Sequence, residues 1–151
     1  MKRLSILILL FCACAPRTNW EPPIPMNLSM LTAFARNKMV YKRDPVWGLL
    51  DNLQSIEAMN YQLKENGFIE GDCEDYAHYL GWTLERMGYS PTWSIAIPPY
   101  RHTLCAFKTD KGWRFFSNQV LYYVYFTSLQ NIVTYWCETE GYEPTILWMA
   151  Y

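Results

Sequence analysis

The fold is decided by residues 71–87, which read GDCEDYAHYLGWTLERM. Asp72 is a suitable helix N-cap, and apolar residues follow it at spacings of three and four, so the sequence predicts a helix over residues 73–87 that ends at Gly88. Cys73 would then open this helix. Because unpaired backbone amides and the helix dipole stabilise a thiolate at this position, Cys73 is a candidate nucleophile.

Other helices and strands are predicted on both sides of this segment. Upstream, Asn27 can cap a helix over residues 28–40, and a second helix over residues 53–65 can end at Gly67. Downstream, the apolar period changes to two, which predicts strands over residues 92–97, 102–108, 113–118 and 120–126, with a hairpin turn at 109–112. A helix over 129–138, capped by Ser128, and a strand over 145–151 complete the pattern. Helices followed by an antiparallel meander predict a single α+β domain over residues 27–151.

A nucleophilic cysteine needs a base, and the chain has 2 histidines. His78 lies five residues after Cys73 on the same predicted helix and therefore points to a different face, so it is interpreted as a packed or surface residue. His102 opens a strand, and a strand start at a sheet edge can face a helix N-terminus. We therefore predict that His102 is the base.

The third member of the site should orient His102 from the neighbouring strand. With the hairpin turn at residues 109–112, Ser117 and Asn118 both come near His102. Asn118 is the preferred partner because its amide oxygen can accept from an imidazole N–H; Ser117 is one alternative, and the other is that neither residue takes this role.

An oxyanion formed at Cys73 would be stabilised by backbone amides at the helix start. A side-chain donor from upstream would assist, with Gln54 as the named candidate and Asn52 or Trp47 as alternatives.

These residues resemble the bacterial transglutaminase-like cysteine proteinases. Residues 71–77 are similar to the nucleophile motif of that family, and residues 102–118 are similar to its histidine strand, turn and third-residue strand. Further upstream, the lead-in residues that match are Tyr41, Asp44, Trp47, Gly48 and Asp51. The resemblance covers residues 40–119 and implies a papain-like fold, with the nucleophile at a helix N-terminus packed on an antiparallel sheet. The family has an aspartate at the third position, where this chain has Ser117 followed by Asn118.

The resemblance implies a thiol protease, a hydrolase that acts on a peptide or protein substrate as a monomer. Two alternatives remain. One is an acyltransferase that crosslinks proteins through the same acyl-enzyme, and the other is a papain-like binding module without turnover. No cofactor is required, although Asp72 and Glu74 occupy positions at which some family members bind calcium. The alternative is that both acidic residues stabilise the N-terminus of the helix.

The first residues predict a targeting segment. Lys2 and Arg3 precede an apolar run over residues 4–11 that is too short to span a bilayer, so residues 1–14 are interpreted as a signal peptide. Residues 11–14 resemble a lipobox in which Cys14 would carry the lipid, and residues 15–26 form a proline-rich tether. The predicted location is the bacterial cell envelope, with contact to the membrane only through the lipid anchor. Plain secretion and a retained anchor are the alternatives.

Composition excludes two other classes of protein. Hydrophobic residues make up 51% of the chain and aromatic residues 17%, which argues against disorder. The formal net charge of -1 gives no basic surface for a phosphate backbone, so nucleic acid is not an expected partner. Cys105 and Cys137 are either separate thiols or a disulfide pair.

Overall fold

The computed structural model describes residues 20–43, 53–146 and 149–150. In chain order its elements are α1 (Leu28–Lys38), β1 (Met39–Tyr41), α2 (Ile56–Asn66), β2 (Ile69–Gly71), α3 (Cys73–Arg86), β3 (Thr92–Ile97), the 3₁₀ turn η1 (Pro98–Tyr100), β4 (His102–Thr109), β5 (Gly112–Ser117), β6 (Val120–Phe126), α4 (Leu129–Glu140) and β7 (Met149–Ala150). The protein is therefore an α+β protein, as its sequence predicts.

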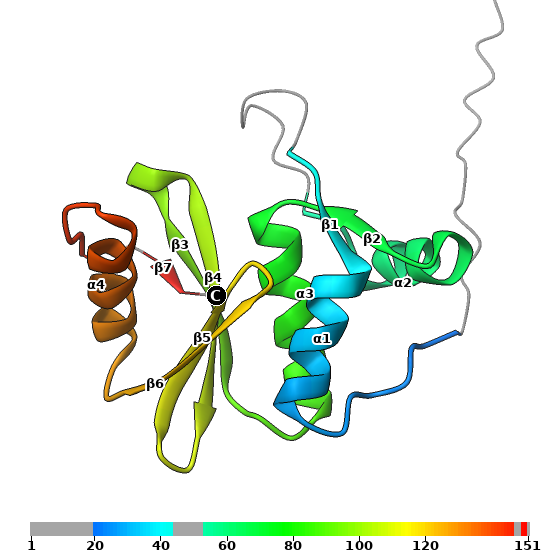
Figure 1. The fold of residues 1–151 in the computed structure, drawn as a ribbon, viewed down its shortest axis with the longest axis horizontal. Coiled ribbons are helices and arrows are strands. Elements are labelled where there is room, and N and C mark those ends of the chain that lie inside the picture. The colour runs from blue at the N-terminus through cyan, green and yellow to red at the C-terminus, as the bar shows by residue number, and fades with distance from the viewer. Residues whose placement is uncertain (1–19, 44–52, 147–148, 151) are drawn as a thin grey trace, which may run out of the picture.

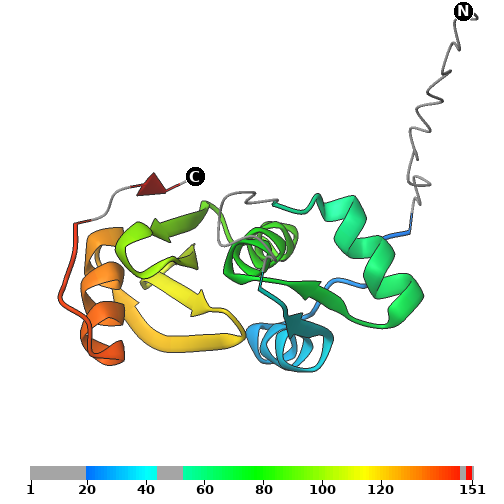
Figure 2. The same ribbon diagram turned by 90° about the horizontal axis from the view of Figure 1, so that it is seen from above.

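The main sheet separates two groups of helices. Its strands follow the order β6-β5-β4-β3-β7, and each is antiparallel to its neighbour. Helices α1, α2 and α3 lie on one side of this sheet, and α4 lies on the other (Figure 1). The same order of layers is visible from above (Figure 2). Each side has its own apolar core, one centred on α3 and one on α4, and strands β4 and β5 contribute to both.

The helices begin where polar side chains cap them. The side chains of Asn27, Ser55, Asp72 and Ser128 each accept a hydrogen bond from a backbone amide in the first turn of their helix. At α3, Asp72 and Asp75 form a reciprocal capping box, which fixes Cys73 as the first helical residue. The predicted start of α3 is thus confirmed.

Several predicted boundaries were wrong, and the helix predicted over residues 129–138 continues to Glu140. The first helix stops at Lys38, because Met39–Tyr41 pairs in parallel with Ile69–Gly71, a ladder that the sequence did not predict. The second helix starts at Ile56, where the Ser55 hydroxyl caps it. The last strand is shorter than the predicted 145–151: it covers Met149–Ala150, and residues 142–146 form no regular element.

Some predictions fall on residues that lie outside the described ranges. These are the signal peptide over residues 1–14 with Cys14, the first part of the tether, and the upstream residues Asp44, Trp47, Gly48, Asp51 and Asn52. They remain predictions. Among the described helices, none combines the length and the hydropathy that a bilayer span requires.

Candidate functional site

Cys73 lies where α3 meets the beginning of β4. Its side chain is buried, with 7% of its surface exposed, and its Sγ lies 3.9 Å from the carbonyl oxygen of Arg101. The backbone N–H of Thr103 is close enough to this sulfur to lower its pKa. Arg101 and Thr103 are the two chain neighbours of His102, so the Cys73 sulfur lies against the backbone beside the predicted base, while the His102 ring itself stacks on Trp136 of α4.

His102 is held by two side chains from other elements. Its Nε2 lies 2.9 Å from the Oγ of Ser117, the last residue of β5. The imidazole also stacks on the indole of Trp136 in α4, with the ring centroids 4.8 Å apart and the planes 15° from parallel. Trp136 donates its Nε1–H to the same Ser117 Oγ over 3.3 Å. Whether Nε2 donates to the Ser117 hydroxyl or accepts from it depends on the tautomer of the imidazole.

The residue that contacts the ring is Ser117, the alternative, and not the preferred Asn118. In the β4–β5 ladder Ser117 pairs with Leu104, so Ser117 and His102 are diagonal neighbours on one face of the sheet. Asn118 lies beyond β5, in the two-residue turn to β6, with a φ of 48°. Its Oδ1 is buried and has no hydrogen-bond partner in the described part of the chain. Asn118 is thus a turn residue, of a type that tolerates left-handed backbone.

Gln54, the named oxyanion donor, has both amide hydrogens engaged elsewhere. Its Nε2 donates to the Glu70 carbonyl and to Asp75 Oδ2, each over 2.8 Å, and its backbone N–H donates to Asp75 Oδ1 over 2.9 Å. Its Oε1 accepts from Gln62 over 2.5 Å. Gln54 therefore holds the buried carboxylate of Asp75 and has no amide hydrogen left to serve as an oxyanion donor.

Asp72 and Glu74, the calcium candidates, have structural contacts of their own. Asp72 Oδ1 accepts from the backbone amides of Glu74 and Asp75 at 3.0 and 3.5 Å. Glu74 Oε1 accepts from the Thr103 hydroxyl over 3.5 Å, which links α3 to β4 beside His102. Within the described ranges no group of three or more His, Cys, Asp or Glu side chains could hold a metal. Calcium therefore remains a prediction.

Burial keeps both members of the pair uncharged. Burial raises the pKa of the Cys73 thiol to about 11, and the carboxylate of Asp72 adds to this effect, while the Thr103 N–H opposes it. Burial also lowers the pKa of His102 to about 4. At neutral pH the Cys73 thiol and the His102 imidazole are consequently both uncharged.

The two remaining described cysteines are separate thiols. Cys105 and Cys137 are both buried and free. Cys105 belongs to the core on the α3 side of the sheet and Cys137 to the core on the α4 side, so the sheet lies between them. The open question of a disulfide between them is answered by this placement.

Trp136 is a site residue that the sequence reasoning missed. Its contacts with His102 and Ser117 join α4 to two strands, and only the tertiary arrangement brings them together. The nearest signal in the sequence is its place on the apolar face of the predicted helix, which indicates burial and no more. Comparison of this chain with protein-family models, curated proteins and solved structures gives no match.

Proposed function

We propose that the protein is a cysteine-dependent hydrolase of peptide or amide bonds, with Cys73 as nucleophile, His102 as base and Ser117 as the residue that orients the base. One observation carries the proposal: the Cys73 sulfur, at the N-terminus of a helix, contacts the backbone on both sides of a histidine. That histidine is in turn held by a hydroxyl and an indole. Covalent catalysis requires a nucleophile, a base and a group that orients the base, and the proposal assigns these roles to Cys73, His102 and Ser117.

In the proposed reaction, the Cys73 sulfur attacks the carbonyl carbon as the thiol proton passes to Nδ1 of His102. The carbonyl π electrons move to oxygen, and amides at the start of α3 stabilise the charge. The imidazolium, which donates its Nε2–H to Ser117, then protonates the leaving amine as the C–N bond breaks. Water, deprotonated by His102, hydrolyses the thioester. An amine in place of this water would give transfer, so the crosslinking alternative stays within the same proposal.

The third residue sets an expectation for the rate. A neutral hydroxyl stabilises an imidazolium less than a carboxylate does, because hydrogen bonds that involve an ion are roughly twice as strong. Since Ser117 occupies the position at which the resembled proteinases have aspartate, we expect slow turnover and a faster Ser117→Asp variant.

A second candidate function is peptide binding without turnover. Two observations favour it: the raised pKa of Cys73 with the lowered pKa of His102, and the hydroxyl at the third position. For either function the partner is a peptide or protein. The location in the cell envelope rests on residues 1–26 alone.

Acyl-enzyme formation tests the choice between these functions. The purified domain would be mixed with a p-nitrophenyl ester of an N-acetylated amino acid, and the intact mass and acylated residue would be followed by mass spectrometry. If the protein is a hydrolase, the ester should acylate Cys73. The rate of acylation should fall at least about 100-fold in His102→Gln and should not change in Cys105→Ser. Acylation of Cys73 no faster than in a denatured control would reject the hydrolase and leave the binding module.

The same assay separates Ser117 from Asn118. Ser117→Ala is expected to slow acylation, Ser117→Asp to accelerate it, and Asn118→Gly to leave it nearly unchanged, because Asn118 lies in the turn. Equal losses in Ser117→Ala and Asn118→Gly would contradict the assignment of Ser117.

A further inference from the structure

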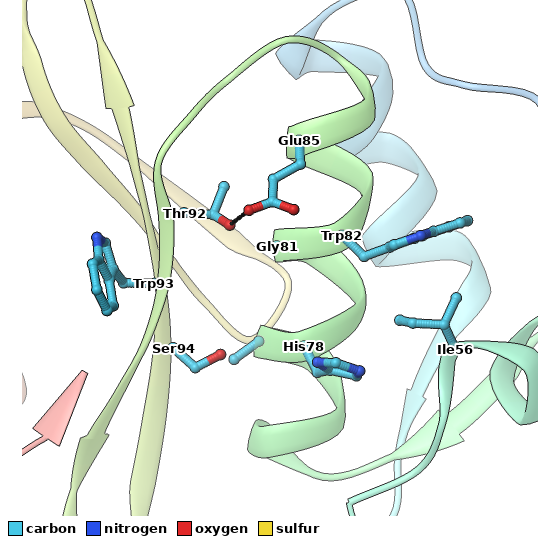
Figure 3. Close-up of a pocket in the computed structure, with 9 residues that line it drawn as sticks. Ile56, His78, Gly81, Trp82, Glu85, Thr92, Trp93 and Ser94 are labelled. Carbon is cyan, nitrogen blue, oxygen red and sulfur yellow. Dashed lines mark hydrogen bonds between the residues drawn. The ribbon is translucent and has the colours of Figure 1, made fainter. Parts of the chain in front are cut away.

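A pocket with a volume of about 250 Å³ runs along α3, with β3 on one side and Ile56 of α2 on the other (Figure 3). Its floor consists of small residues, Ala77 and Gly81 on α3 and Ser94 on β3, while Ile56 and Trp82 supply apolar walls. In Figure 3 the side chains of Thr92 and Ser94 point from β3 towards the helix. A side chain could therefore lie along α3 beside β3, because the residues there are short; at Gly81 itself an added Cβ would already contact Thr92 Oγ1 at 3.6 Å.

The pocket lies on the same stripe of α3 as the proposed nucleophile. Cys73, Ala77 and Gly81 follow one another at intervals of four residues, which places them on one face of the helix. At a rise of about 1.5 Å per residue, Ala77 lies about 6 Å and Gly81 about 12 Å beyond Cys73 along the axis.

Strand β3 gives the same separation. Ile97 pairs with His102, and Ser94 lies three residues earlier in the strand, which corresponds to about 10 Å. A peptide with its reacting carbonyl at Cys73 would therefore bring its second to fourth neighbouring side chain, at about 3.3 Å per residue, to the pocket.

The charge of the pocket selects one kind of side chain. Glu85 contributes a carboxylate, which the Thr92 hydroxyl fixes by donating to Oε1 over 2.8 Å (Figure 3). No lysine or arginine lines the pocket among the described residues. The nearby guanidinium of Arg86 stacks on Trp82 at 4.4 Å and pairs with Glu21 over 2.8 Å, so it is committed elsewhere.

We propose that this pocket binds a basic side chain, lysine or arginine, of the peptide substrate. The aliphatic stem would pack between Ile56 and Trp82 above the floor at Gly81, and the cationic end would pair with Glu85. This inference rests on the proposed function only for the identity of the peptide as a substrate; the binding itself does not require turnover.

The test uses the Cys73→Ala protein, so that binding is measured whether or not the wild type is a hydrolase. The probes are N-acetylated, amidated pentapeptides of alanine with lysine, norleucine or glutamate at one position, scanned along the peptide. The readout is the NMR shift of the Trp82 indole N–H and of the His78 imidazole, both of which line the pocket. We expect the lysine peptide to bind about 3- to 10-fold more tightly than the norleucine peptide.

Two variants test the assigned contacts. Glu85→Gln should reduce the affinity for the lysine peptide to that for the norleucine peptide, while Glu138→Gln, an exposed glutamate on α4, serves as the matched control and should change nothing. Gly81→Leu should abolish the shifts by filling the floor, with the circular dichroism spectrum as the check on folding.

Three results would overturn the inference: norleucine bound as tightly as lysine, a preference that survives Glu85→Gln, or no saturable shift with any peptide up to millimolar concentration. None of these results would bear on acylation of Cys73, which the ester assay measures separately.

Discussion

Replacing His102 by glutamine should change how the stability of the protein depends on pH. The lowered pKa of His102, from 6.5 to about 4, means that the unfolded chain binds a proton between these values while the folded protein does not. Folding therefore becomes less favourable as the pH falls from about 6.5 towards 4, and the loss levels off below about 4. Glutamine has no such proton, so the variant should lack this part of the pH dependence.

The size of the effect follows from these two values. At about 1.4 kcal/mol per pH unit, the full difference between 6.5 and about 4 corresponds to about 3 kcal/mol. Partial protonation reduces this to a loss of about 1.4 kcal/mol at pH 5.5 and about 2.5 kcal/mol at pH 4.5. We take these values as upper limits, because the imidazole is only partly buried and water screens its charge.

Urea unfolding at pH 7.0, 5.5 and 4.5 would measure the effect in the wild type, in His102→Gln and in His78→Gln. The wild type should lose about 2 kcal/mol more than His102→Gln between pH 7.0 and pH 4.5. His78→Gln removes the other imidazole and leaves the His102 ring signal alone for NMR titration. A stability difference that is the same at all three pH values, or a His102 midpoint near 6.5, would refute the argument that burial keeps this ring neutral.

Four further predictions concern residues around the site. Cys73, with its pKa raised to about 11, should react with iodoacetamide at a rate that rises about tenfold per pH unit through pH 9, and a plateau at or below pH 8 would contradict this. Asp75→Ala should cost about 3–5 kcal/mol in urea unfolding, because it leaves two donors of Gln54 and the N–H of Asp72 without their acceptor, whereas Asp75→Asn should cost less. Gly71→Ala should cost about 1–3 kcal/mol, since an added Cβ would lie 2.6 Å from the Cβ of Asp75; a neutral result would mean that α3 shifts freely. Asn118→Ala should cost about 1 kcal/mol and Asn118→Gly less, because a φ of 48° is strained for alanine, and equal costs would speak against this.

The parts of the fold that could be predicted from the sequence depend on local signals. Ser128 caps α4, as the sequence predicts, and the predicted bounds of β3 and β6 match the structure to the residue. The strands β1 and β2 could not be predicted in the same way. Each has three residues and forms through pairing with a partner about 30 residues away, which leaves no periodic pattern.

The candidate site was predictable to the same extent. Cys73 and His102 could be chosen because a capped helix start and a strand start are local features. The choice between Ser117 and Asn118 depends on where β5 ends, and a shift of one residue exchanges the two faces of a strand. The role of Gln54 depends on its contact with Asp75, 21 residues away. In the sequence Asp75 is one of several acidic residues at a helix start, and nothing there indicates that its carboxylate is buried.

The electrostatics of the site connect its chemistry with the predicted location. A thiolate is the form of cysteine that oxidises, and an exported protein meets an oxidising environment. Burial raises the pKa of Cys73 to about 11 and raises the pKa of Cys105 as well, so both thiols stay protonated at neutral pH. A resting thiol that loses its proton only as it attacks a bound carbonyl would react with substrate and resist oxidants. The same burial that argues against a preformed thiolate–imidazolium pair is thus compatible with catalysis, provided that His102 receives the proton during attack and Ser117 holds the ring in place.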